Sequence, residues 1–182
     1  GHEAVAKLLL DHHADVAAAD NDGVTALMFA AADGHEAVAK QLLDHGADVA
    51  AADNDGKTAL ILAALLGHKP VAKLLLDYGA DVAAAQKNGA TALMGAAVGG
   101  HEAVAKLLLD HHADVAAAGN DGVTALILAA ECGHEAVAKL LLDHRADVAA
   151  AGNDGRTALI LAAECGHEAV AKLLLDHRAD VA

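Results

Sequence analysis

Residues 20–52 read DNDGVTALMFAAADGHEAVAKQLLDHGADVAAA, and this stretch decides the fold because it recurs along the 182-residue chain. The dipeptide Gly-His marks each copy, and its glycine stands every 33 residues, at Gly1, Gly34, Gly67, Gly100, Gly133 and Gly166. A fixed period of this length is the signature of a repeat architecture. We expect one array without a linker, made of a partial copy over 1–19 and copies over 20–52, 53–85, 86–118, 119–151 and 152–182.

Each copy predicts two short helices and a loop. Residues 26–32 are helix formers, and Thr25 in front of them supplies a hydroxyl that can cap the first helix. Residues 36–44 place valine and leucine on one stripe and charged side chains on the opposite side, as an amphipathic second helix does. Gly46 suits the left-handed residue that ends a helix, and Asp-Asn-Asp-Gly at 53–56 favours a tight turn.

Helices as short as these are unstable alone in water, because nucleation costs more than a few hydrogen bonds return. Each copy can bury its stripe of valine and leucine only against the neighbouring copy. The sequence therefore predicts an all-α solenoid in which helix-turn-helix units stack in a row.

These residues resemble the ankyrin repeat family, whose unit carries Asp-x-x-Gly-x-Thr-Pro-Leu-His, Ala-Ala-x-x-Gly-His and Leu-Leu-x-x-Gly-Ala-Asp-Val-Asn. The corresponding stretches here are DNDGVTALM at 20–28, AAADGH at 30–35 and LLDHGADVA at 42–50. The resemblance implies an ankyrin-type α-solenoid with hairpin-like loops. It also implies a protein–protein interaction module that binds its partner through the loop tips and the concave surface of the first helices.

The copies depart from the family pattern at several fixed positions. The motif proline is alanine in all five copies, and the motif histidine is replaced by Met28, Ile61, Met94, Ile127 and Ile160. We expect apolar packing to take the place of the hydrogen bonds that this histidine makes in the family. The helix-ending glycine is replaced by His13, His112, Arg145 and Arg178. A non-glycine residue costs about 1 kcal/mol in a left-handed conformation, so mild backbone strain is expected there.

Positions that vary between copies give the candidate binding residues. The resemblance implies that the partner contacts two equivalent positions, or slots, of each copy: the residue after the turn glycine and the residues just before Gly-His. The residues expected to bind the partner are Phe29, Asp33, Lys57, Leu65, Leu66, Lys87, Ala90, Val98 and Glu131. Leu65, Leu66 and Val98 would form an exposed apolar patch that seats an apolar anchor. Two alternatives stay open: simple drift between copies, or Leu66 folding back onto its own helix.

Charge narrows the choice of partner. Twelve Lys and Arg against 26 Asp and Glu give a net charge of −14, which repels phosphate backbones and anionic lipid. We therefore expect no nucleic acid and no membrane surface as partner, but a protein with a neutral or basic surface. No apolar run reaches the about 18 residues of a membrane-spanning helix, and the N-terminus has no signal-peptide pattern. A soluble protein of the reducing cytoplasm is expected, with Cys132 and Cys165 as free thiols.

The thirteen histidines invite a metal site, but all of them occupy repeated slots: six in Gly-His, five in Asp-His and two in place of glycine. Equivalent residues on stacked helices lie about 8 to 10 Å apart, too far to share an ion with bonds of about 2 Å. The chain has no serine, no phosphate-binding glycine loop and no Cys-His-acid arrangement. We expect no metal, no cofactor and no catalytic residue, and hence a protein that is not an enzyme.

An alternative to the interaction module is an engineered or excised scaffold with no natural ligand. The copies 119–151 and 152–182 differ over their shared length only at Val123 and Arg156, and the chain starts within a copy at Gly1. Neither end carries a polar capping copy, so the two apolar ends could stack end to end in self-association.

Overall fold

The computed structural model describes residues 2–177, and over that range the chain forms eleven helices joined by loops. Their bounds are α1 Glu3–Asp11, α2 Ala26–Ala32, α3 Glu36–Asp44, α4 Ala59–Leu65, α5 Lys69–Asp77, α6 Ala92–Val98, α7 Glu102–Asp110, α8 Ala125–Glu131, α9 Glu135–Asp143, α10 Ala158–Glu164 and α11 Glu168–Asp176. Among these described residues, no helix has the length and apolar content that a bilayer crossing requires.

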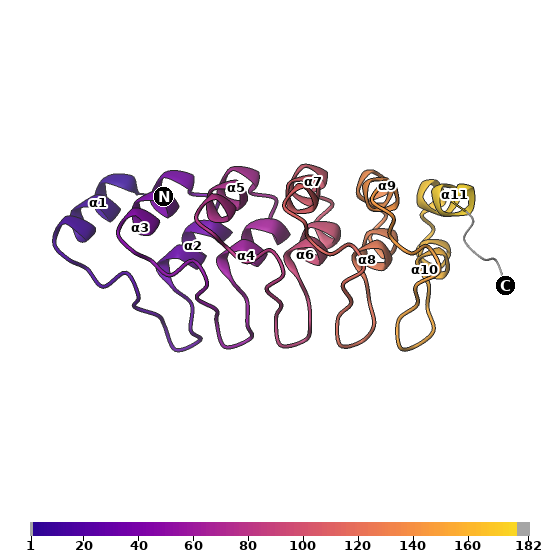
Figure 1. Cartoon of the computed structure of the whole chain (residues 1–182), viewed down its shortest axis with the longest axis horizontal. Coiled ribbons are helices and arrows are strands. Elements are labelled where there is room, and N and C mark those ends of the chain that lie inside the picture. The colour runs from indigo at the N-terminus through magenta and orange to yellow at the C-terminus, as the bar shows by residue number, and fades with distance from the viewer. Residues whose placement is uncertain (1, 178–182) are drawn as a thin grey trace.

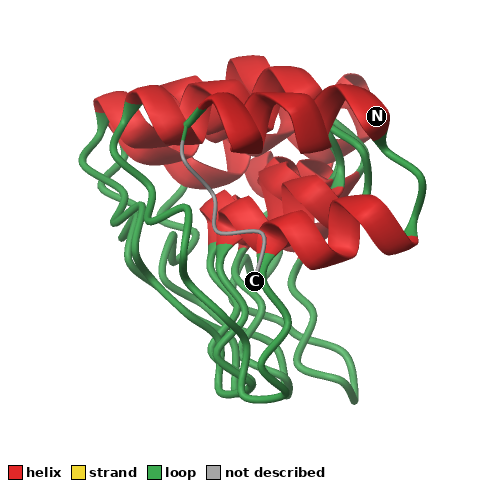
Figure 2. Ribbon diagram, turned by 90° about the vertical axis from the view of Figure 1, so that its right-hand side faces the viewer, coloured by secondary structure: helices red, strands yellow, loops and turns green. Residues whose placement is uncertain are grey.

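The helices lie in two rows (Figure 1). The first helices, α2, α4, α6, α8 and α10, form one row, and the second helices, α1, α3, α5, α7, α9 and α11, form the other. Each first helix contacts the next first helix along the row, and each second helix contacts the next second helix. The loops project together to one side of the helices (Figure 2). The predicted all-α solenoid of stacked helix-turn-helix units is confirmed.

Each projecting loop folds back like a hairpin but is closed by a single β-bridge, for example between Ala52 and Thr58. We call the turns at 20–23, 53–56, 86–89, 119–122 and 152–155 the fingertips. Within the second fingertip, Asp53 Oδ1 accepts hydrogen bonds from the backbone N–H groups of Asp55 and Lys57 at 2.9 and 2.8 Å. The turn residues that the sequence places there therefore stabilise the loop locally.

Threonine caps the first helices as predicted. Thr58 Oγ1 accepts a hydrogen bond from the N–H of Ile61 at 3.4 Å, and the same bond recurs in all five first helices. The hydroxyl satisfies one of the backbone donors that a helix leaves unpaired in its first turn. Four of these threonines, Thr25, Thr58, Thr91 and Thr124, are buried, whereas Thr157 in the last copy is partly exposed although it makes the same bridge.

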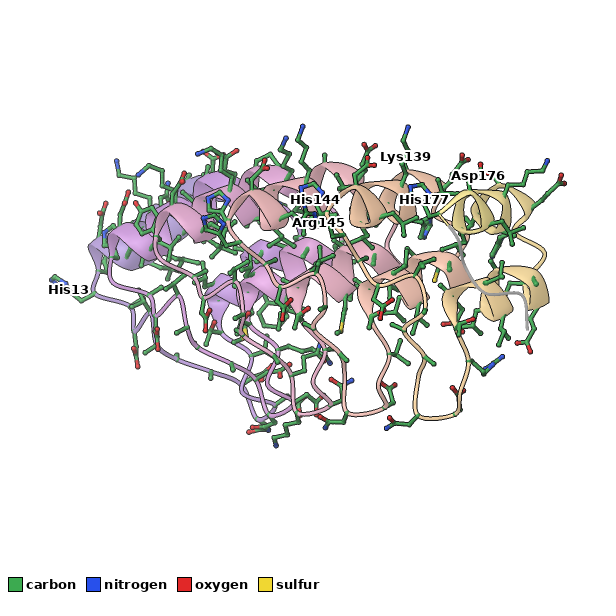
Figure 3. All side chains as sticks on the ribbon, turned by 45° about the vertical axis from the view of Figure 1, so that its right-hand side comes forward. His13, Lys139, His144, Arg145, Asp176 and His177 are labelled. Atoms are coloured by element: carbon green, nitrogen blue, oxygen red, sulfur yellow. The ribbon has the colours of Figure 1, made fainter. Side chains whose placement is uncertain are left out.

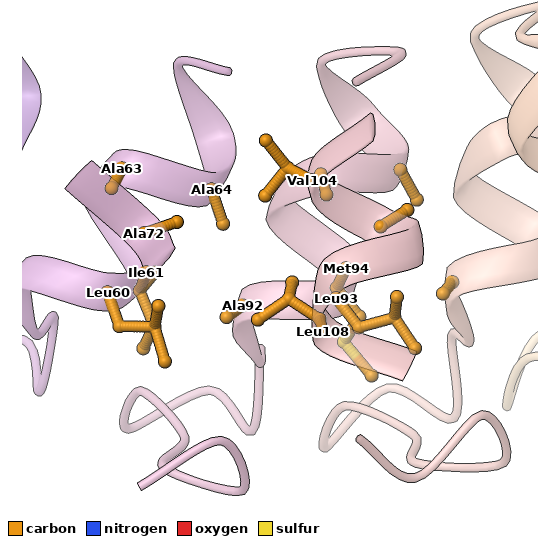
Figure 4. Packing of buried hydrophobic residues seen from close by; sticks show 14 of the residues in the cluster. Leu60, Ile61, Ala63, Ala64, Ala72, Ala92, Leu93, Met94, Val104 and Leu108 are labelled. Atoms are coloured by element: carbon orange, nitrogen blue, oxygen red, sulfur yellow. The ribbon is translucent and has the colours of Figure 1, made fainter. Parts of the chain in front are cut away.

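The core runs along the stack between the two rows. Figure 4 shows the part of it that lies at α4 to α7. Leu60 and Ile61 are 1% exposed, and Ala63 and Ala64 are fully buried, because small side chains let neighbouring first helices approach closely. Apolar packing does replace the motif histidine at Met28, Ile61, Met94 and Ile127, which are all buried. Ile160 departs from this expectation at 39% exposed, since no further first helix packs on α10 within the described residues.

Left-handed residues end the second helices. Gly46 has φ of 85°, and φ is 58° at His13, 66° at His112 and 66° at Arg145. The expected left-handed conformation of these non-glycine residues is confirmed, while Arg178 lies outside the described residues. Arg145 lies beside His144 on the second-helix row, away from the fingertips (Figure 3).

Candidate functional site

The surface of interest consists of the exposed side of the first helices and the fingertips beside them. We call the exposed side of the first helices the first-helix face. Its largest exposed apolar side chains are Phe29 at 55%, Leu66 at 47% and Val98 at 39%. Every copy contributes the same slots to this face, so the residues that fill the slots decide its local shape and charge.

Hydrogen bonds between consecutive copies hold the fingertips in register. The N–H of Asn54 donates to Asp22 O at 2.8 Å, and its side-chain Nδ2 donates to Asn21 O at 3.0 Å. The backbone bond recurs from Lys87, Asn120 and Asn153, and the side-chain bond recurs from the two asparagines. Lys87 stands where the other copies have asparagine, so it keeps only the backbone bond.

The Gly-His pairs fix the ends of the first helices. His101 Nε2–H donates to Leu65 O at 3.1 Å, and His134 Nε2–H donates to Val98 O at 2.9 Å. The same bond joins His68 to Ala32 and His167 to Glu131. These four histidines thus connect their copies to the preceding ones and position the residues just before Gly-His.

A hollow of about 250 Å³ lies in the middle of the first-helix face. We call it the central hollow. Its lining comes from three consecutive copies: Ile61, Leu65, Gln86, Asn88, Ala90, Met94, Gly95, Val98, Gly119, Asp121, Val123 and Leu128. Three of the predicted binding residues, Leu65, Ala90 and Val98, are therefore brought together.

The other predicted binding residues lie elsewhere on this side of the molecule. Leu66 follows the end of α4 and is exposed, whereas Leu65 is only partly exposed. Phe29 and Asp33 line a second hollow, of about 390 Å³, between α1 and α2. The remaining residues are Lys57, Lys87 and Glu131, and they lie on the fingertip loops and at the end of α8.

Charged groups on this surface differ in whether a partner neutralises them. Lys57 Nζ lies 3.3 Å from Asp55 Oδ2, and Arg156 pairs with Glu164. Glu131 and Asp121 are exposed, and no ion pair joins either of them to a cation among the described residues. The side of the central hollow toward α8 therefore carries two carboxylates without an ion pair, and the charge of Arg156 acts on one of them, Glu131.

Two exposed cysteines follow the last two first helices. Cys132 and Cys165 are both free, which confirms the prediction of unpaired thiols. Burial raises the pKa of the Cys132 thiol, and the neighbouring Glu131 carboxylate raises it further. A thiol with a raised pKa is a poor nucleophile near neutral pH, because the thiolate is the reactive form. Among the residues that the structure describes, no three His, Cys, Asp or Glu side chains gather to hold a metal ion.

Sequence reasoning missed the centre of the hollow. It singled out Leu65, Ala90 and Val98 from slots that contact partners in the family, but not Gly95, Met94 or Leu128, which complete the lining. A comparison of equivalent positions could have found it: residues 29, 62, 95, 128 and 161 are Phe, Leu, Gly, Leu and Leu. One copy lacks a side chain where all the others carry a large one.

Comparison with known proteins agrees with this architecture. The chain matches a family model described as ankyrin repeats (3 copies) over residues 1–86, 50–119, 82–152 and 116–182, which together span it from end to end. A search of curated proteins found no match. The 33-residue period, the paired helices and this match all agree, and the chain belongs to the ankyrin repeat family.

Proposed function

We propose that the chain is a non-catalytic protein-binding module whose partner contacts the fingertips and the first-helix face. Ankyrin repeats are in general modules of protein–protein interaction. The observation that carries the proposal is the central hollow, an apolar depression beside the exposed Val98 and bordered by the fingertips. Apolar pockets of this kind seat the few side chains that dominate the energy of an interface.

Charge on the same surface favours a partner with a neutral or basic surface. The chain carries a net charge of −14, and the carboxylates of Asp121 and Glu131 face solvent and form no ion pair among the described residues. Complementary charge accelerates the encounter of two proteins and discriminates against partners of like charge. The proposed binding should therefore become slower as the salt concentration rises, because salt screens exposed charges.

The test is capture of partners from a cell lysate by the intact chain, compared with a Leu66→Glu variant. Leu66 is 47% exposed, so a carboxylate at this position leaves the core intact while it places charge beside the hollow. We expect the variant to keep its helical circular dichroism and to lose the captured proteins. Leu175→Glu is the matched control, because Leu175 is 45% exposed but belongs to the second-helix row. Equal capture by the Leu66→Glu variant would contradict the proposed binding face.

End-to-end self-association is a second candidate, favoured by apolar side chains at both ends of the stack. Val5 and Leu9 are each 54% exposed, whereas their counterparts Val71 and Leu75 are fully buried in the interior. At the other end, Ile160 and Leu175 are similarly uncovered. Light scattering across a concentration series should show a mass that rises above that of the monomer. A monomeric mass at the highest concentration would count against this association.

We also propose a reducing compartment such as the cytoplasm. Cys132 and Cys165 are both exposed and free, and exposed thiols persist where glutathione and thioredoxin keep them reduced. Protein isolated with its thiols blocked at lysis should show both cysteines in the reduced form. A mixed disulfide on either cysteine would argue for another compartment.

A further inference from the structure

The central hollow exists because one copy lacks a side chain on the first-helix face. Position 95 is glycine, whereas the same slot holds Phe29, Leu62, Leu128 and Leu161 in the other copies. A Cβ atom at Gly95 would lie 3.3 to 3.4 Å from the backbone and Cβ of Leu65, which shows how closely the preceding copy approaches. The absence of a leucine here leaves room on the surface that no other described residue fills.

The size and lining of the hollow define what fits. Its walls are the apolar side chains of Ile61, Leu65, Met94, Val98 and Leu128. An apolar cavity of about 150 Å³ accommodates a benzene molecule. A hollow of about 250 Å³ that opens to solvent is therefore large enough for one branched aliphatic or aromatic side chain.

Polar groups at the rim restrict the residues next to that side chain. Asp121 lines the hollow, and its Oδ1 accepts a hydrogen bond from the N–H of Val123, which orients the carboxylate. Glu131 lies three residues after Leu128 on α8, on the same side of that helix. Neither carboxylate pairs with a cation in the described part of the chain, whereas Lys57 on the other side is already paired with Asp55. The rim toward α8 favours a positively charged neighbour.

We propose that the central hollow accepts one large apolar side chain from a bound peptide segment, with a lysine or arginine next to it that contacts Asp121 and Glu131. This inference rests on the proposed function, because it names the anchor of the partner that binds the first-helix face. Charge-assisted hydrogen bonds from lysine or arginine to carboxylates add both energy and orientation. Gly95 is then a specificity-determining position, since it decides which copy receives the anchor.

The test selects random displayed peptides on the purified chain and measures the affinity of the selected peptides for variants. We expect the peptides to share an aliphatic or aromatic residue followed or preceded closely by lysine or arginine. Gly95→Leu restores the residue of the neighbouring copies and should weaken binding at least tenfold. Lys106→Leu adds a leucine to the exposed side of α7 in the same copy, outside the first-helix face, and should leave the affinity unchanged. Glu131→Gln should weaken binding several-fold at low salt and have little effect at high salt.

Circular dichroism checks that the Gly95→Leu variant folds. Val98→Asp is a second variant that should prevent an apolar side chain from binding in the hollow, because Val98 lines the hollow and is 39% exposed. Peptides that bind both variants as tightly as the original chain would overturn the inference. If such peptides are nonetheless lost on Leu66→Glu, the binding face stands and only the hollow fails as the anchor site. Peptides insensitive to every one of these substitutions would overturn the proposed function as well. Selected peptides without a basic residue near the anchor would refute the role of Asp121 and Glu131.

Discussion

Gly100 and Gly166 occupy the same slot in different copies, and their replacement by alanine separates two contributions to stability. Both glycines are left-handed, with φ of 70° and 76°. A Cβ atom at Gly100 would lie 2.5 Å from Nδ1 of His134 and 2.6 Å from its Cε1, whereas a Cβ atom at Gly166 would meet nothing within 4 Å. The loss of unfolding free energy in Gly166→Ala therefore reports the cost of the left-handed backbone alone. The loss in Gly100→Ala also contains the cost of displacing the His134 imidazole.

The expected magnitudes follow from these contacts. A left-handed alanine costs about 1 to 2 kcal/mol, and the stiffer unfolded chain returns about 0.4 to 1 kcal/mol, so Gly166→Ala should destabilise by about 1 kcal/mol. Displacing His134 breaks its 2.9 Å bond to Val98 O. A hydrogen bond contributes about 0.5 to 1.5 kcal/mol, and the ring also loses its packing. Gly100→Ala should therefore cost about 2 kcal/mol or more.

The assay is urea unfolding followed by far-ultraviolet circular dichroism, with the free energy of unfolding taken from a linear extrapolation. A double-mutant cycle with His134→Ala isolates the coupling between the two side chains. In the His134→Ala background, Gly100→Ala should cost only about 1 kcal/mol, as the backbone term alone predicts. Equal losses from Gly100→Ala with and without His134 would refute the reasoning, because the clash could not then be the cause. Gly133→Ala, which meets His167 at 2.5 Å, should behave as Gly100→Ala does.

Three further predictions test local interactions. Thr124→Ala should lower the free energy of unfolding by about 1 kcal/mol, because the helix loses its cap. Thr124→Ser keeps the capping hydroxyl and should keep most of the stability, and urea unfolding measures both variants. Hydrogen bonds from Lys40 and Tyr78 lower the pKa of Asp44, so Tyr78→Phe should raise that pKa in an NMR titration. Because the pKa of Asp44 is lowered on folding, its contribution to stability is present above the ordinary aspartate range and is lost as pH falls through the folded pKa. The raised pKa of Cys132 predicts alkylation slower than that of an unstructured cysteine peptide, and Glu131→Gln should accelerate it; an unchanged rate would show that the carboxylate has no influence.

The helices could be placed from the sequence because their signals are local. Thr58 before a run of helix formers specifies where α4 begins, and the structure shows the expected cap. Gly46 and its non-glycine counterparts come just after each amphipathic run, and their left-handed conformation could be predicted because such a residue commonly ends a helix. These signals involve residues within a few positions of each other, so a single copy of the repeat contains them all.

The candidate site was only partly predictable. Leu65 and Val98 were identified from slots that contact partners in the family, and both line the central hollow. Leu66, identified by the same reasoning, is exposed but is not part of the lining, because it follows the last turn of α4. Gly95 was visible as a departure from the other copies, but nothing in its own copy indicates a hollow.

The sequence by itself determined the period, the two helices of each copy and the need for copies to stack, because capping, periodicity and helix length act over short distances along the chain. Only the tertiary structure decided which side chains stay exposed. Leu65, Met94 and Leu128 belong to three different copies, and the space between them depends on how closely those copies pack. The exposure of equivalent residues likewise depends on what lies beside them, as Ile127 and Ile160 show with 1% and 39%. The physical reason is that a surface is shaped by neighbours a whole repeat away, which no local pattern specifies.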